Sequence, residues 1–331
     1  MKGSTSTLKC CLCGLDKRTH LRNSVMKIAI LGATSHIAKN LIYYFARDPQ
    51  YELFLFARNK KAVHEFMKSC DSISFSRVLG FEEFFDGNFD AVINCVGVGD
   101  PARLKNVGAE IFRLTEYFDN LVIDYLLSHK NVVYINFSSG AVYGTAFDSG
   151  ITKDSLATID INNITSADFY RIAKLNAEAK HRAMPDLCIV DLRIFSFFSR
   201  FIDLDSGFLL CEMVRCAKDH TIFHTNSVDI IRDYVAPKDL FMLVQLCLEK
   251  GSLNCALDVY SAKPVRKSEL LKLFAEEFGL EIEVEEKNHS SPTGTKTSYF
   301  STNYNAQRLL GYSPENTSIC NVQREARILI Q

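Results

Sequence analysis

The chain has 331 residues, which is enough for one large domain or for a large domain with a smaller one beside it. Its composition, 47% hydrophobic and 23% charged, is ordinary for a globular protein that folds in water. With a formal net charge of −1, the chain has no overall electrostatic attraction to nucleic acid or to an anionic membrane, so we expect neither as a partner.

The cysteines and the hydropathy pattern indicate the compartment. There are 11 cysteines, an odd number without regular spacing. Cys95, Cys188 and Cys247 lie in apolar runs that are typical of buried thiols in a reducing environment. The sequence has no run of about 18 apolar residues that would predict a membrane span, and its N-terminus has no apolar signal-peptide core. These patterns together predict a cytoplasmic protein.

Residues 1–25 are polar, basic and without periodicity. We expect either a disordered leader or an extension upstream of a natural start at Met26, because a strand begins directly after that methionine. Four residues of this segment could offer soft ligands to zinc: Cys10, Cys11, Cys13 and His20. No second cysteine pair follows them, as a structural zinc site usually requires, so we expect no metal.

After this leader the pattern predicts a strand, a turn, a helix and a second strand. The apolar run 26–31 is typical of a buried parallel strand, and a helix over 39–48 and a strand over 51–58 follow. The turn between the first strand and the helix is where a dinucleotide would bind, with backbone N–H groups facing its pyrophosphate. The candidate cofactor residues in this turn are Gly32, Thr34, Ser35, His36 and Ile37. Ser35 and Ala38 stand where a glycine-rich turn would have glycine, so a generic turn remains the alternative.

The second strand ends in A-R-N-K-K, residues 57–61, and this segment bears on the type of cofactor. NAD-binding folds usually place a carboxylate here for the adenosine ribose. No carboxylate is present, and Arg58, with Asn59 beside it, could instead pair with the 2′-phosphate of NADP. We therefore favour NADP(H) over NAD(H), and a solvated basic helix start is the alternative.

Two further strands end in residues suited to a ligand. The run 89–97 predicts a buried strand that reaches the cofactor edge of the sheet. Its last residues are candidate cofactor contacts: Cys95, Val96 and Gly97. After a long amphipathic helix over 111–127, a strand over 131–137 leads into S-S-G-A-V-Y-G, residues 138–144. Hydroxyls at the carboxyl end of a parallel strand lie where ligands bind in open α/β sheets.

The pentad Y-R-I-A-K places Tyr170 and Lys174 on one face of a predicted helix, one turn apart. An ammonium beside a phenol favours the phenolate, which would lower the pKa of Tyr170 from about 10 and suit it to proton transfer near neutral pH. The alternative is a surface tyrosine and lysine that share a face by chance.

Five features follow one another in order: the Gly32 turn, the strand end at 94–97, S-S-G-A-V-Y-G, Y-R-I-A-K, and R-D-Y-V-A-P-K-D from residue 232. In this order the chain resembles the extended short-chain dehydrogenase/reductases, specifically the NAD-dependent epimerase/dehydratase family that acts on nucleotide sugars. The resemblance covers about residues 26–315. It implies an α/β fold with a Rossmann-type doubly wound parallel sheet over 26–192. A smaller nucleotide-sugar-binding lobe would occupy mainly 193–331, with elements that return to the sheet.

The resemblance also implies catalytic roles for three residues. Ser139 matches the serine or threonine that hydrogen-bonds the reacting oxygen. Tyr170 matches the acid/base tyrosine, and Lys174 matches the lysine that binds the nicotinamide ribose and lowers the pKa of the tyrosine. The implied chemistry is hydride transfer at a sugar carbon, coupled to proton transfer at its oxygen.

Substrate contacts are implied further along the chain. Arg232 matches an arginine that contacts the diphosphate of the sugar nucleotide, with a salt bridge to Asp233 or Asp239 as the alternative. Ser196 stands where an asparagine often contacts the substrate phosphate, and the serine puts that contact in doubt. A run of short elements fits a smaller α/β lobe: a strand C-A-L-D-V-Y, a helix over 268–278 and a strand over 281–285.

Members of this family are mainly epimerases, 4,6-dehydratases and ketoreductases. The best-known dehydratases carry an Asp-Glu pair just after the catalytic residue, where this chain has Gly140 and Ala141, which argues against that chemistry. We expect an NADP(H)-dependent 4-keto-sugar reductase of polysaccharide or deoxysugar biosynthesis. A C4 epimerase with tightly bound NAD and an inactive cofactor-binding homologue are the alternatives. The family also suggests a homodimer through a four-helix bundle of helices 106–128 and 166–183.

Overall fold

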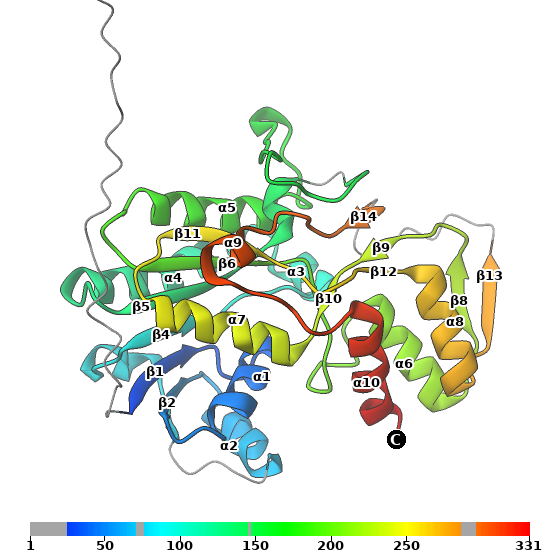
Figure 1. Cartoon of the computed structure of the whole chain (residues 1–331), viewed down its shortest axis with the longest axis horizontal. Helices are drawn as coiled ribbons and strands as arrows, with labels where there is room; N and C mark the ends of the chain where they lie inside the picture. The colour runs from blue at the N-terminus through cyan, green and yellow to red at the C-terminus, as the bar shows by residue number, and fades with distance from the viewer. Residues whose placement is uncertain (1–24, 71–75, 145–146, 286–295) are drawn as a thin grey trace, which may run out of the picture.

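The computed structural model describes residues 25–70, 76–144, 147–285 and 296–331, so the leader with its candidate zinc ligands lies outside the described residues. A seven-stranded parallel sheet forms the centre of the molecule, in the order β11-β6-β5-β4-β1-β2-β3 (Figure 1). Its strands are β1 (Met26–Leu31), β2 (Tyr51–Phe56), β3 (Ser76–Leu79), β4 (Ala91–Asn94), β5 (Val133–Ser139), β6 (Ile189–Ile194) and β11 (Cys255–Val259). The predicted Rossmann-type fold is confirmed.

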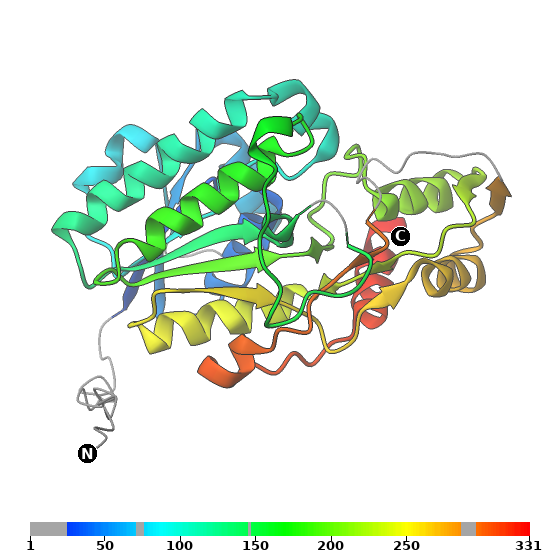
Figure 2. The ribbon, with the colours of Figure 1, turned by 90° about the horizontal axis from the view of Figure 1, so that it is seen from above.

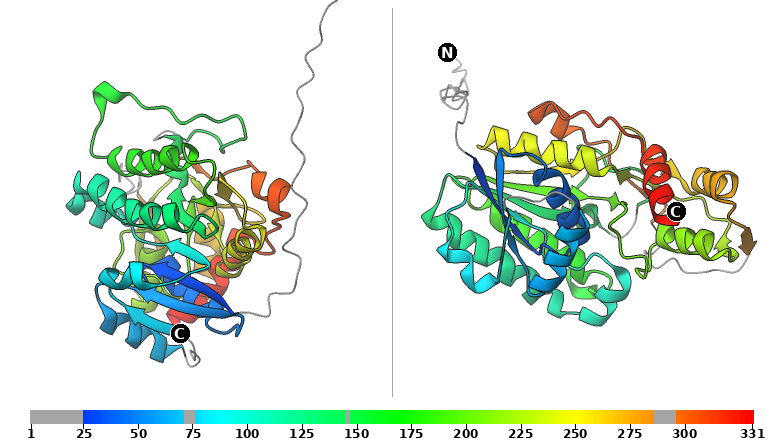
Figure 3. Two further views of the ribbon diagram at one scale, coloured as in Figure 1. Left: turned by 90° about the vertical axis from the view of Figure 1, so that its left-hand side faces the viewer. Right: turned by 90° about the horizontal axis from the view of Figure 1, so that it is seen from below.

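Helices cover both faces of this sheet (Figures 2 and 3). One face carries α1 (His36–Phe45), α2 (Lys60–Ser69) and α7 (Pro237–Lys250), and the other carries α4 (Glu110–Ser128) and α5 (Phe169–Arg182). Alternate residues of β1 pack into the two layers, since Ile28 and Ile30 join one core and Ala29 and Leu31 join the other. Because both faces are buried, the strand reads as a continuous apolar run.

The order of the strands reverses direction beside β1. β1 pairs with β2 on one side and with β4 on the other, so the chain winds outward in both directions from this point. In open sheets of this kind, ligands bind outside the carboxyl ends of the strands where the winding reverses. The ends of β1, β4 and β5 are therefore where the candidate site residues should gather.

The run C-A-L-D-V-Y, which we expect in the smaller lobe, instead forms the seventh strand of the main sheet. β11 pairs in parallel with β6, from Cys255 opposite Val190 to Val259 opposite Ile194. Its residue Leu257 is fully buried. Sequence position is misleading here because the chain leaves the sheet after β6 and returns to it through α7.

The smaller lobe adjoins the edge of the sheet formed by the carboxyl ends of its strands, and it has a core of its own (Figure 1). Its helices are α6 (Leu209–Asp219), α8 (Lys267–Phe278) and α10 (Ser318–Ile330). Its short strands form three small sheets: β7 (Ser196–Phe197) with β10 (Tyr234–Val235), β8 (Phe223–Asn226) with β13 (Ile282–Glu285), and β9 (Ile231–Arg232) between β12 (Val265–Arg266) and β14 (Ser298–Tyr299).

The remaining helices are short. They are η1 (Phe81–Asp86), α3 (Pro101–Val107), η2 (Gly140–Tyr143), η3 (Ile161–Asn163) and α9 (Asn305–Leu310). Across the described ranges, no helix combines the length and the apolar character that crossing a membrane requires.

Candidate active site

The turn between β1 and α1 depends on Gly32. This residue has a φ of +75°, and a Cβ placed on it would lie 3.0 Å from both the carbonyl carbon of Cys95 and the backbone nitrogen of Val96. Only glycine combines that conformation with such a close approach. The turn is therefore held against the end of β4, as a dinucleotide site of this fold requires.

Ser35 begins helix α1 without strain. Its φ is −72° and its ψ is 157°, which any residue can adopt, and its Oγ accepts a hydrogen bond of 3.3 Å from the backbone N–H of Ala38. A serine thus replaces the expected glycine because it works as an N-cap. Thr34, before it, is exposed, and His36 and Ile37, after it, form the first turn of the helix.

His36 connects this turn to the chain that enters the smaller lobe. Its Nε2 lies 2.8 Å from Oγ of Ser199. That Oγ already accepts hydrogen bonds from the side chain of Asn40 (2.9 Å) and the backbone N–H of Phe201 (3.2 Å), so its own proton must go to His36. Burial and the nearby Lys39 lower the pKa of His36 to about 3. The imidazole is therefore neutral and carries its proton on Nδ1.

Arg58 stands exposed after β2, where it was expected to select the cofactor. Among the residues that the structure describes, it makes no ion pair. The two residues that follow it bind other groups. The side-chain oxygen of Asn59 caps α2 by accepting a hydrogen bond from the backbone N–H of Ala62 (3.0 Å), and Lys60 pairs with Glu83 (3.0 Å). Arg58 is thus the cation at this strand end that is left for an anionic ligand.

Lys174 reaches from α5 to the ends of β4 and β5. Its ammonium donates a hydrogen bond of 2.7 Å to the carbonyl of Phe137, and a Cβ on Gly97 would lie 3.5 Å from it. Burial lowers the pKa of Lys174. It also raises the pKa of the Cys95 thiol, which therefore stays protonated. The structure brings together Lys174, Gly97 and Cys95 at the carboxyl ends of β4 and β5.

The two serines at the end of β5 point to opposite sides. Ser138 donates a hydrogen bond of 2.5 Å to the carboxylate of Glu178. Ser139 accepts from the backbone N–H of Ala141 (3.2 Å) and lies 3.2 Å from the hydroxyl of Tyr299. Side chains alternate along a strand, so the two serines face opposite sides of the sheet.

The pKa of Tyr170 is shifted in the opposite direction from the one that the sequence predicts. Burial raises the pKa of its phenol, and a hydrogen bond with Ser139 only partly offsets that effect. Lys174 does not lower it, since the ammonium is directed at the carbonyl of Phe137. The expected lowering of the pKa is therefore absent, and Tyr170 holds its proton at neutral pH.

Arg232 is buried in β9 without a carboxylate partner among the described residues. It is 6% exposed; its Nη1 donates to the carbonyl of Ile231 (2.9 Å), and its Nη2 has no hydrogen-bond partner. Neither alternative salt bridge forms. Asp233 accepts from Ser261, and Asp239 accepts from the backbone N–H groups of residues 315 and 316. Burial lowers the pKa of Arg232.

The remaining substrate candidate, Ser196, lies half-buried in β7 opposite Tyr234 of β10. Two residues of the site are missing from the sequence-based set. Tyr299 contacts Ser139, and Lys296 lies over the ring of Tyr299 with its Nζ 4.4 Å from the ring centre. Both follow the last predicted strand by more than ten residues, and no motif marks them.

The fold and these side chains define a dinucleotide-dependent α/β enzyme. The model of the NAD dependent epimerase/dehydratase family matches residues 28–259, so the chain belongs to that family. The family expected from the five motifs is thereby confirmed, and with it an NAD(P)-dependent enzyme. No curated protein sequence matches the chain.

Solved structures of low sequence identity share the fold. A UDP-glucuronic acid 4-epimerase from Bacillus cereus, in complex with UDP-glucuronic acid and NAD, matches with a TM-score of 0.75 and 15% identity over 92% of this chain and 99% of its own. A dTDP-glucose 4,6-dehydratase from Bacillus anthracis with NAD gives a TM-score of 0.74 and 14% identity, over 92% and 96%. A UDP-glucose-4-epimerase from Stenotrophomonas maltophila with NAD gives 0.76 and 14%, over 92% and 98%.

Proposed function

We propose that the chain is an NADP(H)-dependent reductase of a nucleotide-linked keto sugar, acting at C4 in polysaccharide or deoxysugar biosynthesis. The observation that carries the proposal is the grouping of Ser139, Tyr170 and Lys174 at the carboxyl ends of β4 and β5, beside the Gly32 turn. Hydroxyls of a serine and a tyrosine that share a hydrogen bond can hold one substrate oxygen between them.

The residues around Gly32 fit a dinucleotide. The first N–H groups of a helix have no acceptor within that helix. Ser35 takes the N–H of Ala38, which leaves those of His36 and Ile37 for a pyrophosphate at the N-terminus of α1.

The cofactor preference rests on Arg58. A guanidinium that pairs with no described carboxylate, at a strand end that lacks a carboxylate in its sequence, suits the 2′-phosphate of NADP better than the bare ribose of NAD. The solved neighbours contain NAD, and their identity to this chain is too low to transfer that preference.

A cofactor held by the Gly32 turn and Lys174 would supply the hydride that reduces the carbonyl carbon of the sugar. Ser139 orients the carbonyl oxygen through its Oγ. Tyr170 donates the proton of its Oη to that oxygen, which becomes a hydroxyl group. Lys174, one turn along α5 from Tyr170, would hold the nicotinamide ribose of the bound cofactor, and Tyr170 would recover its proton from water.

The protonation of Tyr170 supports the direction of the reaction. Burial raises the pKa of this phenol, so the residue enters the reaction as an acid. Reduction of a ketone requires an acid at this position, whereas the first step of an epimerase removes a hydride and needs a base. A phenol that holds its proton can serve as that acid.

A C4 epimerase with tightly bound NAD is the second candidate. Two of the reported neighbours with this fold are 4-epimerases with NAD. The two functions differ in stoichiometry, because a reductase consumes one NADPH per turnover and an epimerase leaves its cofactor unchanged.

The decisive experiment combines cofactor titration with turnover. Calorimetry should detect reversible binding of NADPH that is tighter than binding of NADH, and a dTDP- or UDP-4-keto-6-deoxy sugar should then consume NADPH in equal amounts. Copurified NAD that does not exchange would point to the epimerase, and binding of no cofactor would point to an inactive homologue.

The Tyr170→Phe variant tests the role of the phenol. It should lower kcat by roughly 10²- to 10⁴-fold, because the proton donor is lost. NADPH affinity, measured by calorimetry, should stay within about twofold of the wild type. Turnover at the wild-type rate would refute the assigned role of Tyr170.

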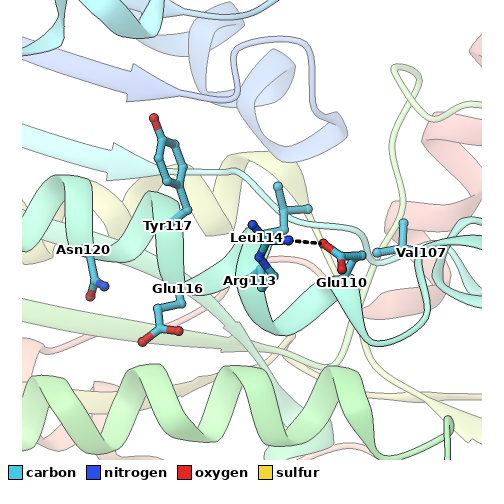
Figure 4. Close-up of a pocket in the computed structure, with 7 residues that line it drawn as sticks. All are labelled: Val107, Glu110, Arg113, Leu114, Glu116, Tyr117 and Asn120. Carbon is cyan, nitrogen blue, oxygen red and sulfur yellow. Dashed lines mark hydrogen bonds and ion pairs between the residues drawn. The ribbon is translucent and has the colours of Figure 1, made fainter.

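We further propose that the chain works in the cytoplasm as a homodimer through α4 and α5. These helices pack side by side (Figure 2), and Tyr117 and Leu127 on the outer side of α4 are 63% and 56% exposed. Figure 4 shows a groove on this helix, with Arg113 paired to Glu110. The groove is lined by Val107, Glu110, Arg113, Leu114, Glu116, Tyr117 and Asn120.

A further inference from the structure

Two distant segments of the chain are joined across the carboxyl edge of the central sheet. Nη2 of Arg103, in α3, donates a hydrogen bond of 2.7 Å to Oδ2 of Asp203, in the segment between β7 and α6. Four residues earlier in that segment, Oγ of Ser199 lies 2.8 Å from Nε2 of His36 in α1. Helix α1 covers one face of the sheet, and α3 leads into α4 on the other face. The segment 199–203 therefore crosses the sheet edge between them.

These contacts close a ring around the carboxyl ends of β1 and β4. β1 continues through the Gly32 turn into α1, the segment 199–203 connects α1 with α3, and α3 follows β4 in the chain. β4 in turn pairs with β1, up to Asn94 opposite Leu31. A dinucleotide binds at this position in sheets of this topology. A cofactor inside the ring leaves only when one of the contacts opens.

The contacts at the α1 end of the segment are strong. Ser199 is fully buried, and its Oγ takes part in three hydrogen bonds. The next residue, Arg200, donates from its backbone N–H and its Nε to one oxygen of Glu325 in α10, and from Nη2 to the other, each at 2.9 Å. The side chain of Glu325 is only 3% exposed. This end of the segment is therefore fixed to α1 and to the smaller lobe.

The contact at the α3 end is weak by comparison. The side chains of Arg103 and Asp203 are 66% and 52% exposed. Ion pairs that face water contribute little to stability, and salt screens them. The other carboxylate near Arg103 is that of Asp100, at 3.8 Å, which lies in the same segment as α3 and ties it to nothing else. The pair of Arg103 and Asp203 is thus the contact of the ring that opens most easily.

Helix α3 has the features of a mobile flap. Among its side chains that the structure describes, residues 103–107, none is fully buried and none belongs to a hydrophobic core. Gly99 precedes the helix and Gly108 follows it with a φ of +53°, and a Cβ on either would meet no atom within 4 Å. Segments with few buried contacts open at a low cost in free energy, and glycines at their ends absorb the change in backbone angles.

We infer that α3 is a flap over the cofactor site and that the ion pair of Arg103 with Asp203 is its latch, which sets the rate at which the cofactor enters and leaves. The inference rests on the cofactor site of the proposed function and not on the direction of the reaction. A reductase exchanges its cofactor in every turnover, so the latch would also bear on its turnover rate.

A latch has a kinetic signature that a cofactor ligand lacks. The ion pair joins two parts of the protein and does not include the cofactor, so weakening it should speed entry and release alike and leave Kd unchanged. Loss of one exposed ion pair corresponds to roughly a two- to fivefold change in each rate. A side chain that bound the cofactor itself would instead change Kd.

Stopped-flow fluorescence with NADPH, and with NADH in parallel, measures both rates. Arg103→Gln and Asp203→Asn should each speed association and displacement by roughly two- to fivefold, and the double variant should show no more than either single one. Arg103→Lys, which keeps the charge, should stay close to the wild type. Lys238→Gln is the matched control, because it removes another exposed ion pair, with Glu315 at 2.9 Å.

The dependence on salt gives a second readout. Raising NaCl from about 0.05 M to about 0.5 M shortens the Debye length and weakens the exposed pair. Displacement of the nucleotide should therefore accelerate more in the wild type than in Arg103→Gln. An equal acceleration in both proteins would contradict the latch.

Four further results would overturn the inference. They are wild-type rates in Arg103→Gln, an equal acceleration in Lys238→Gln, a weaker Kd with an unchanged association rate, and no binding of either nucleotide to the wild type. The third would make Arg103 a ligand of the cofactor. Failure of the proposed reductase is a separate outcome, in which Arg103→Gln would still exchange nucleotide faster but no keto-sugar nucleotide would consume NADPH.

Discussion

A buried histidine should make the stability of this protein depend on pH between about 6 and 9. His181 of α5 is fully buried between two carboxylates, with Nδ1 2.9 Å from Asp191 and Nε2 2.7 Å from Asp119. Burial alone would lower the pKa of His181, but hydrogen bonds and charge from the two aspartates outweigh it and raise the pKa to about 9. His181 is therefore an imidazolium that bridges α5 to β6 and α4.

The size and sign of the effect follow from this pKa. A rise from the ordinary 6.5 to about 9 corresponds to about 3 kcal/mol of stability, at 1.36 kcal/mol per pH unit. The folded state binds the proton more tightly, so this stabilisation is fully present below pH 6.5. It is lost as the pH rises through about 9, because the folded protein must then release the proton as well.

Urea unfolding followed by circular dichroism, at half-unit steps from pH 6 to 9, would measure the effect. The difference in unfolding free energy between wild type and His181→Gln should shrink by about 3 kcal/mol over this range. His64→Gln, at an exposed position of α2, should show no such trend. A difference between wild type and His181→Gln that stays constant with pH would refute the imidazolium bridge.

Three further predictions follow from the site and the surface. Arg58→Ser should weaken NADPH binding by roughly tenfold and leave NADH unchanged, as measured by calorimetry; equal losses for both would contradict the 2′-phosphate role. Gly32→Ala should destabilise the fold by about 1–3 kcal/mol in urea unfolding, because a Cβ meets the backbone at 3.0 Å and a φ of +75°. Tyr117→Arg should convert the proposed dimer to a monomer in light scattering, and an unchanged mass would place the interface elsewhere.

The local elements could be predicted because their signals are local. The apolar run 26–31 and the Gly32 turn mark the first βα unit, and the helical spacing of Tyr170 and Lys174 places both on one face. The order of these motifs along the chain then defines the family and hence the fold. Each single motif uses residues within a few positions of one another, and only their order spans the chain.

The rest of the site depends on contacts that only the folded chain creates. Ser199 reaches His36 across 163 residues, and Tyr299 reaches Ser139 across 160. The pKa of Tyr170 depends on burial, which the spacing of Tyr170 and Lys174 does not reveal. For the same reason, the strand C-A-L-D-V-Y could be recognised but not placed in its sheet.

The chain passes between the sheet and the smaller lobe several times. It enters the lobe after β6, returns through α7 and β11, leaves again for β12, α8 and β14, and contributes α9 to the sheet side before α10 closes the lobe. No continuous stretch of the gene therefore encodes the lobe. The lobe could not be transplanted onto another protein as one fragment. A single protease cut in a segment that connects the sheet to the lobe would leave two fragments that remain associated.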